Sequence, residues 1–309
     1  MTLSKMPILK NLMAERIVTL LPSATEIICG LGLGDKLVGI THECDYPADI
    51  THLPRVTSSA IGKGLSSQEI DNQVRNHLED NAALYSLDLP LLESLQPDLI
   101  VTQALCDVCA VSMSEVSIAC DTLTSRPALL NLEPMSLGDV FDTILAVGDA
   151  TGYRQNAFEY VAALKSRVAG VRERRRNDRE NSRQRPRVAF LEWIDPPFNA
   201  GHWTPELIEI AGGIDCLGEK HQPSRTISFD DIVMADADVL VIAQCGFDLA
   251  RSTQDLDILK RNLPWDELKA VRNNRVHIVD GNAYFSRSGP RLVDSLLIME
   301  QLLWGRNSL

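Results

Sequence analysis

The sequence has no apolar run long enough to cross a membrane or to form the central part of a secretory signal. Its first sixteen residues, MTLSKMPILKNLMAER, are interrupted by Lys5 and Lys10. A signal peptide needs about 7–15 consecutive apolar residues before a small-residue cleavage site, and a membrane-spanning helix needs about 20. We therefore expect a cytoplasmic protein with no membrane span.

Two further absences limit the class of protein. The seven cysteines are odd in number and scattered over 309 residues, unlike the cysteines of a disulfide-stapled secreted domain. The formal net charge is -12, and the one basic stretch, residues 172–187, also carries Glu173, Asp178 and Glu180. Because nucleic-acid binding needs clustered Lys and Arg, we interpret this stretch as a solvated helix face and expect no nucleic-acid partner.

Known catalytic motifs are also missing. The sequence has no GxGxxG after an expected strand, no Walker A motif, no GxSxG and no HExxH. Residues 62–67 are rich in glycine and serine but lack the Gly-Lys-Ser/Thr order of a phosphate-binding loop. We therefore predict that the protein is not an enzyme, and a catalytic function would have to use the Cys and His residues described below.

Short apolar runs, typical of buried strands, alternate with helical patterns along the chain. The expected strands are residues 16–21, 36–40, 99–102, 187–191, 239–242 and 275–279. This β-α alternation predicts parallel sheets covered by helices. At finer detail, a capping box of Ser23 and Glu26 is expected to open the first helix, and residues 120–123 are expected to form a short strand.

One long helical stretch divides the chain. Residues 151 to about 180 contain no proline and are rich in Ala, Arg, Lys and Glu, which favours a single helix. We expect a first α/β lobe at residues 1–150, a connecting helix and linker at 151–185, and a second α/β lobe at 186–309. The predicted fold class is α/β, with two Rossmann-like lobes joined by one rigid helix.

Polar residues follow the first expected strand, at the edge where parallel sheets bind ligands. Ser23, Thr25 and Glu26 lie there at the start of a helix, whose amide groups suit a polar or anionic ligand group. Capping of the helix is the alternative role.

Cysteine and histidine side chains follow the next two strands of the first lobe. His42 and Cys44 lie after the strand at 36–40, and Cys106 and Cys109 lie after the strand at 99–102. If the two loops meet, these four residues form a Cys3His set that would hold Zn tetrahedrally or coordinate a soft metal, and Zn or Fe is the metal expected. Three buried thiols without metal are the alternative.

The second lobe is expected to supply aromatic and cationic ligand contacts. Two tryptophans near two prolines form a flat apolar wall that suits a macrocycle, although either tryptophan would also serve in the core. Arg287 suits a phosphate or carboxylate, or a structural ion pair, and His202 is a candidate axial ligand to cobalt or iron. The ligand residues predicted in this lobe are Trp193, Asp195, Pro196, His202, Trp203, Cys245, Tyr284 and Arg287.

Three segments of the chain resemble one family of receptors. They are residues 20–27 (LLPSATEI), residues 195–213 (DPPFNAG followed by LIEIAGG) and residues 284–291 (YFSRSGPR). In this order they resemble the periplasmic-binding-protein-like receptors for cobalamin and iron chelates, most of all the cobalamin-binding receptors of ABC importers. The resemblance implies a ligand held between two lobes with little closure, and favours a corrinoid such as cobalamin over a siderophore.

The chain departs from that family in two ways. It lacks the expected export signal, and only one of the two acidic residues that dock such receptors on a permease has a match. Asp230 matches on the second lobe, whereas Pro90 stands at the first-lobe position. We therefore expect a cytosolic solute-binding protein that holds a corrinoid or related metal chelate. The alternatives are a metal-ion-binding protein using Cys44, Cys106 and Cys109, an enzyme acting on a bound metallocofactor through a thiolate, or an importer receptor.

Overall fold

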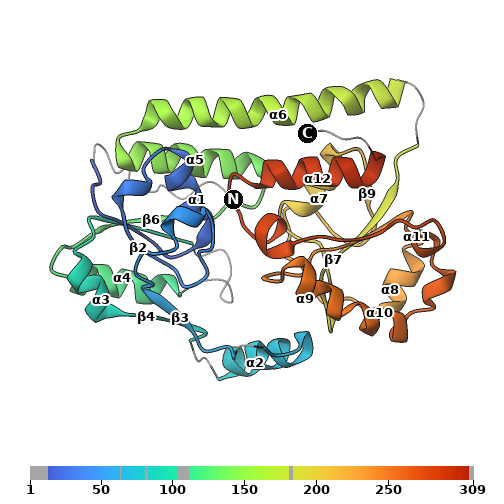
Figure 1. Cartoon of the computed structure of the whole chain (residues 1–309), viewed down its shortest axis with the longest axis horizontal. Coiled ribbons are helices and arrows are strands. Elements are labelled where there is room, and N and C mark those ends of the chain that lie inside the picture. Colours follow the sequence, from blue (N-terminus) through green and yellow to red (C-terminus); the bar gives the residue numbers. More distant parts are fainter. Residues whose placement is uncertain (1–12, 63, 81–82, 104–110, 181–183, 306–309) are drawn as a thin grey trace. The chain divides into compact units, whose positions relative to one another are not determined.

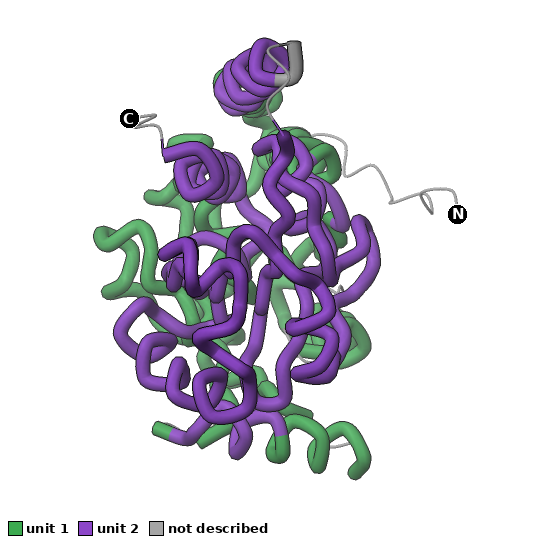
Figure 2. The backbone as a smooth tube through the Cα atoms, turned by 90° about the vertical axis from the view of Figure 1, so that its right-hand side faces the viewer, with its two compact units in different colours: residues 1–64, 72–134, 138–163 green, residues 65–71, 135–137, 164–309 purple. Residues whose placement is uncertain are grey.

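The computed structural model describes residues 13–62, 64–80, 83–103, 111–180 and 184–305. The chain folds into two compact units (Figure 2). The first unit comprises Met1–Gly64, Asn72–Pro134 and Gly138–Ala163, and the second comprises Leu65–Asp71, Met135–Leu137 and Leu164–Leu309. No helix in the described ranges combines the length and apolar character needed to cross a membrane.

The first unit is built on a four-stranded sheet whose strands are all parallel. Their order is β2 (Leu37–Ile40), β1 (Ile17–Thr19), β5 (Leu99–Thr102) and β6 (Ala128–Asn131). Every residue of β1 and β5 is buried, as expected for central parallel strands with helices on both faces. A separate antiparallel pair joins β3 (Thr57–Ser59) to β4 (Tyr85–Leu87).

Helices cover the sheet of the first unit (Figure 1). One apolar cluster joins Val18 of β1 and Ile100 of β5 to Leu92 and Val116, which lie on two of these helices. The helices that lie wholly or partly in this unit are α1 (Pro22–Gly30), η1 (Gly34–Lys36), η2 (Ala48–Ile50), α2 (Ser67–Glu79), α3 (Leu89–Leu95), α4 (Met113–Thr122), α5 (Leu137–Thr151) and α6 (Arg154–Glu180).

The second unit contains a five-stranded mixed sheet. β11 (Val276–Ile278), β10 (Val239–Ile242) and β7 (Arg187–Ile194) run parallel, and β7 also pairs in parallel with β9 (Ile214–Asp215) and antiparallel with β8 (Pro197–Asn199). Its remaining elements are α7 (Thr204–Ile210), α8 (Phe229–Met234), α9 (Leu249–Gln254), α10 (Leu256–Asn262), η3 (Trp265–Glu267), α11 (Lys269–Arg272), η4 (Gly281–Phe285), which is a π-helix, and α12 (Leu292–Trp304).

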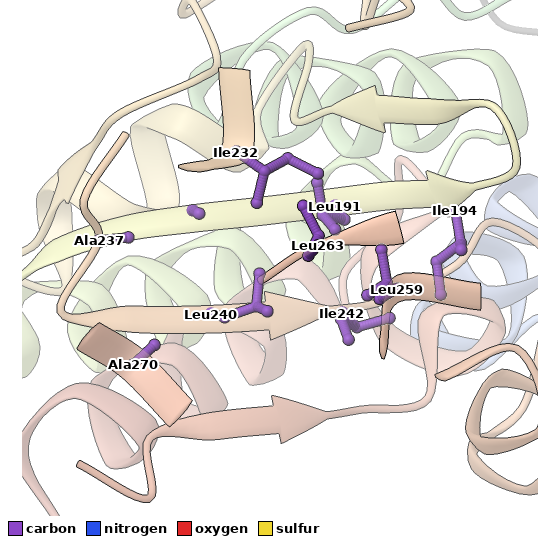
Figure 3. Packing of buried hydrophobic residues seen from close by; sticks show 10 residues of the cluster. Leu191, Ile194, Ile232, Ala237, Leu240, Ile242, Leu259, Leu263 and Ala270 are labelled. Atoms are coloured by element: carbon purple, nitrogen blue, oxygen red, sulfur yellow. The ribbon is translucent and has the colours of Figure 1, made fainter. Parts of the chain in front are cut away.

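One apolar cluster of the second unit lies on one face of this sheet. Leu191 of β7 and Ile242 of β10 are fully buried there against Leu259 of α10 and Ile232 of α8 (Figure 3). Burial of each such side chain stabilises the fold by about 1.5–3 kcal/mol. This cluster fixes the strands whose carboxyl ends carry the candidate site.

Buried charges hold the carboxyl-terminal part of α6 within the second unit. Glu300 of α12 is fully buried and forms ion pairs with Arg174 at 2.6 Å and with Arg175 at 3.1 Å. Arg175 is itself buried, pairs with Asp178 at 2.7 Å, and lies 4.8 Å from the ring centroid of Trp304. The long helix expected from the sequence is therefore present, and it begins at Arg154 because Gly152 adopts a φ of +80° and ends α5.

The predicted fold class, α/β with parallel sheets, is confirmed, but several local predictions were wrong. Pro22 opens α1 two residues earlier than expected, because its fixed φ suits the first helical position, so Leu21 is the N-cap and no side-chain capping bond forms. Residues 120–122 continue α4 rather than forming a strand. The strands β3, β4, β6, β8 and β9 and the helix α9 were not anticipated.

Candidate functional site

The candidate site of the first unit lies at the carboxyl ends of its parallel strands. Ser23, Thr25 and Glu26 are buried in the first turns of α1, directly after β1. The Thr25 hydroxyl lies 2.6 Å from the hydroxyl of Thr19 at the end of β1 and 3.0 Å from the Cys44 sulfur. The structure therefore brings the predicted residues Thr25 and Cys44 together, in a buried network of side-chain oxygen and sulfur atoms.

His42 is held by a second set of contacts at the same edge. Its backbone amide donates to the Thr57 hydroxyl at 3.0 Å, its Nδ1 lies 2.7 Å from that hydroxyl, and its ring centroid lies 5.5 Å from that of Tyr85. A shallow depression is lined by Leu20, Thr41, His42, Glu43, Thr57, Tyr85 and Val111. The orientation of the His42 imidazole is thus fixed by a β3 hydroxyl.

The predicted Cys3His metal set stays a prediction. Cys106 and Cys109 lie outside the described residues, and Cys44 is 1% exposed. Within the described ranges, no three His, Cys, Asp or Glu side chains lie close enough to hold a metal ion.

An aromatic stack forms at the carboxyl edge of the second sheet. The ring centroids of Trp193 in β7 and Phe247 after β10 are 4.9 Å apart, and the Arg251 guanidinium lies 4.3 Å from the Phe247 centroid. Arg251 Nη1 donates to Asp255 Oδ1 at 2.8 Å, and Asp255 Oδ2 accepts from the fully buried Gln244 at 2.9 Å. We call Trp193, Phe247 and Arg251 the aromatic–guanidinium stack.

This stack combines two kinds of recognition surface. Aromatic faces suit a flat macrocycle, and a guanidinium fixed by a carboxylate suits the anionic edge of a ligand. Cys245, also a predicted ligand residue, is exposed two residues before Phe247.

Asp195 and Pro196 form the turn between β7 and β8. Trp193 Nε1 donates to the Asp195 carbonyl at 3.1 Å, so the turn is fixed to the aromatic–guanidinium stack. Burial raises the pKa of the Asp195 carboxyl, and the negative charges of Asp255 and Asp71 add to the rise.

His202 and Trp203 follow β8 in a loop with an unusual backbone. His202 adopts a φ of +52°, its ring centroid lies 5.4 Å from that of Trp203, and burial lowers its pKa, so the imidazole is neutral at pH 7. Trp203 is 6% exposed and its Nε1 donates to the Phe285 carbonyl at 3.0 Å. A neutral imidazole is the form that binds metal.

The last predicted ligand residues lie in and after the π-helix η4. The Tyr284 ring is covered by the Arg291 guanidinium at 4.5 Å. Arg287 is 7% exposed and donates to Asn282 Oδ1 at 3.0 Å, so part of its hydrogen-bonding capacity serves the fold.

Several further residues that the sequence did not indicate lie at these edges. Arg251 lies in α9, four residues after Phe247, which precedes that helix. Thr57 and Tyr85 belong to the unexpected β3–β4 pair, and Glu192 lies in β7 one residue beyond the strand expected at residues 187–191. No short sequence motif marks those three residues.

Two α/β units with parallel sheets, sharing one long helix and carrying aromatic and polar groups at the carboxyl ends of their strands, are the architecture of a two-lobed solute-binding protein. The chain belongs to the periplasmic binding protein family, whose model matches residues 17–283.

Individual relatives support this assignment. The chain is 25% identical over 288 residues to the uncharacterized ABC transporter substrate-binding lipoprotein YvrC of Bacillus subtilis, covering 91% of this chain and 77% of the relative. It is 21% identical over 287 residues to the vitamin B12-binding protein of Vibrio cholerae, covering 92% and 87%. The structure of the periplasmic heme-binding protein RhuT from Roseiflexus sp. RS-1 matches with a TM-score of 0.69 at 23% identity, covering 94% of this chain and 98% of that one.

Proposed function

We propose that this protein binds a flat metal chelate, a corrinoid such as cobalamin or a related metal macrocycle, at the carboxyl ends of its strands. The observation that carries the proposal is the aromatic–guanidinium stack, which offers an apolar ring surface beside a fixed positive charge. Relatives of this chain are described as binding vitamin B12 and heme, two metal macrocycles. His202, neutral and fixed in the adjoining loop, is the residue we propose as axial ligand.

The proposal is tested by titrating the reduced protein with hydroxocobalamin and, separately, with hemin. Total metal is measured first, and binding is followed by calorimetry and visible spectroscopy. We expect one-to-one saturable binding of one of the two chelates. Phe247→Ala should weaken it by about tenfold or more, the usual cost of removing a buried aromatic anchor. Phe158→Ala is the matched control, because Phe158 is a 46% exposed ring that also contacts an arginine.

Other outcomes redirect the proposal. A shift of the visible spectrum that disappears in His202→Ala would identify the axial ligand, whereas binding without any shift would remove His202 from that role. If neither chelate binds and the protein purifies with one Zn or Fe per chain, the chelate proposal is wrong. The metal set of Cys44, Cys106, Cys109 and His42 then becomes the favoured site, and Cys→Ser variants should lose the metal.

We also propose that the protein works in a reducing compartment, the cytoplasm. None of the described cysteines, Cys29, Cys44, Cys120, Cys216 and Cys245, takes part in a disulfide. Cys245 is exposed and provides the test. In intact cells a membrane-impermeant maleimide should label a Cys245-only variant no more than a cytoplasmic control. Strong labelling would contradict the proposal.

An importer receptor is the second candidate role, and Asp230 is the observation that favours it. Asp230 is exposed in the first turn of α8, as a permease-docking acid must be. Pro90, at the corresponding place on α3, is also exposed but carries no charge. Copurification of a permease that is lost in Asp230→Lys would establish this role, and absence of copurification would leave the binding function alone.

A further inference from the structure

We propose that Glu192 is a positioning residue that holds the loop Asn199–Trp203 and thereby sets ligand affinity in the second unit. The proposal rests on the chelate-binding function proposed above, because this loop carries His202 and Trp203. The Glu192 carboxyl group is not part of the aromatic–guanidinium stack, so this role is additional to the ligand contacts described above.

The loop is joined to the segment Ser224–Arg225 and the residues just before it by hydrogen bonds. The His202 amide donates to the Gln222 carbonyl at 2.7 Å, and the His221 amide donates to the His202 carbonyl at 2.9 Å. Further along, the Arg225 amide donates to Asn199 Oδ1 at 2.8 Å. The two segments therefore behave as one paired element.

This pairing keeps His202 in a costly conformation. Its φ of +52° lies in the left-handed region, which is unfavourable for residues with a Cβ. Gly201 allows the loop Asn199–Trp203 to approach Ser224 closely, because a Cβ on Gly201 would lie 2.2 Å from the Ser224 nitrogen. The orientation of the His202 imidazole thus depends on contacts that hold Gly201 in place.

Glu192 supplies such a contact from within β7. Its Oε1 accepts the Gly201 amide at 2.9 Å, and the Ser224 side chain bonds to the same carboxyl. One side chain therefore engages both members of the paired element, immediately before His202. The Glu192 carbonyl accepts the Cys245 amide at 2.9 Å, which fixes the strand position from which the side chain extends.

The ionisable groups around this carboxyl give it a distinctive titration. Burial raises the pKa of Glu192 to about 7, and Asp215 of β9 adds to the rise, against the lowering effects of the Gly201 amide and the Ser224 hydroxyl. Asp215 Oδ1 accepts the amides of Leu217 and Gly218 at 2.9 and 2.8 Å, and burial raises its pKa as well. His202, on the other side of Gly201, is neutral at pH 7 because burial lowers its pKa.

The first arm of the test needs no ligand. The Gly201 amide is followed by ¹H–¹⁵N NMR between about pH 5.5 and 8.5 in the wild type, Glu192→Gln and Glu192→Ala. Glu192→Gln keeps an acceptor oxygen but cannot ionise, and Glu192→Ala removes the acceptor. Glu267→Gln is the control, since Glu267 is exposed in η3 of the same unit. We expect a Gly201 transition near pH 7 in the wild type and control, and none in either Glu192 variant.

The second arm measures hydroxocobalamin and hemin affinity at pH 6 and pH 8. We expect Glu192→Ala to weaken binding about tenfold, as for loss of one hydrogen bond to a charged group, with Glu192→Gln close to wild type and insensitive to pH. A wild-type Gly201 amide without a transition, or equal affinity in a folded Glu192→Ala protein, overturns the proposal. If Glu192→Ala does not fold, a wild-type pH dependence that persists in Glu192→Gln overturns it. If the wild type binds neither chelate, the function proposed above fails, and the Gly201 transition alone decides whether Glu192 positions the loop.

Discussion

Replacing Glu300 should destabilise the second unit far more than replacing any exposed ion-pair residue of α6. Glu300 is fully buried and bonds to Arg174 through two hydrogen bonds, of 2.9 and 2.6 Å, and to Arg175 at 3.1 Å. In Glu300→Gln the shape is kept but the negative charge is lost. Arg175, which is 3% exposed, then loses one of the two carboxylates that balance its charge. It retains the ion pair with Asp178.

The size of the effect follows from this burial. Breaking a buried ion pair by removing one partner costs about 3–5 kcal/mol, because the other charge stays out of water. The matched control is Glu173→Gln on α6, which breaks an ion pair between Arg176 and Glu173, side chains that are 65% and 55% exposed. Exposed pairs contribute only about 0–1 kcal/mol, so the control should stay close to wild type.

The free energy of unfolding of both variants is measured by urea unfolding, monitored by circular dichroism and by tryptophan fluorescence. Trp304 reports on the affected region, because its ring covers Arg175 and its Nε1 donates to the Ala211 carbonyl at 2.7 Å. We expect the midpoint of Glu300→Gln to fall with little change in slope, since the exposed surface on unfolding is the same. Equal free energies of unfolding for the two variants, within about 0.5 kcal/mol, would refute the argument that buried charge anchors α6.

Three further predictions concern the candidate site. Gly201→Ala should destabilise the second unit by about 1–3 kcal/mol in urea unfolding and displace His202, because the new Cβ would overlap the Ser224 nitrogen; unchanged stability would show that the two segments separate easily. Thr25→Val should cost about 1–2 kcal/mol by removing the hydroxyl that bonds to Thr19 and Cys44, and a neutral result would mean that these groups find other partners. Folding raises the pKa of the Glu192 carboxyl from 4.5 to about 7, so the unfolded chain loses this proton at a lower pH than the folded protein does. The contribution of Glu192 to stability is therefore fully present below pH 4.5 and is lost as pH rises through 7. The free energy of unfolding should therefore fall by about 1 kcal/mol from pH 6.5 to 8, and by much less in Glu192→Gln.

The strongly patterned parts of the fold were predictable from the sequence. Residues 239–242 are four consecutive aliphatic residues, and they form the buried β10 at those same positions. α12 also begins and ends where its apolar pattern does, at Leu292 and Trp304. In both segments burial dominates, so that the hydrophobic pattern alone indicates the element.

Elements with weak or polar patterns were not predictable in this way. β3 is Thr57–Ser59, a polar run whose strand conformation depends on pairing with β4, about 28 residues away. The strand that we expected at residues 120–123 lies instead at Ala128–Asn131, where β6 pairs in parallel with β5. Long-range pairing decided both cases, and a local pattern contains no information about it.

The candidate site shows the same limit more sharply. Trp193, His202 and Arg287 could be proposed from residue type and from their positions after strands. Glu192 could not, because its neighbours Leu191 and Trp193 indicate only a strand with an apolar core face. The role that we propose for it rests on hydrogen bonds to Gly201, nine residues away across the β7–β8 turn, and to Ser224. A sequence therefore indicates which side chains suit a ligand, whereas the contacts that hold those side chains in place emerge only once strand pairing is known.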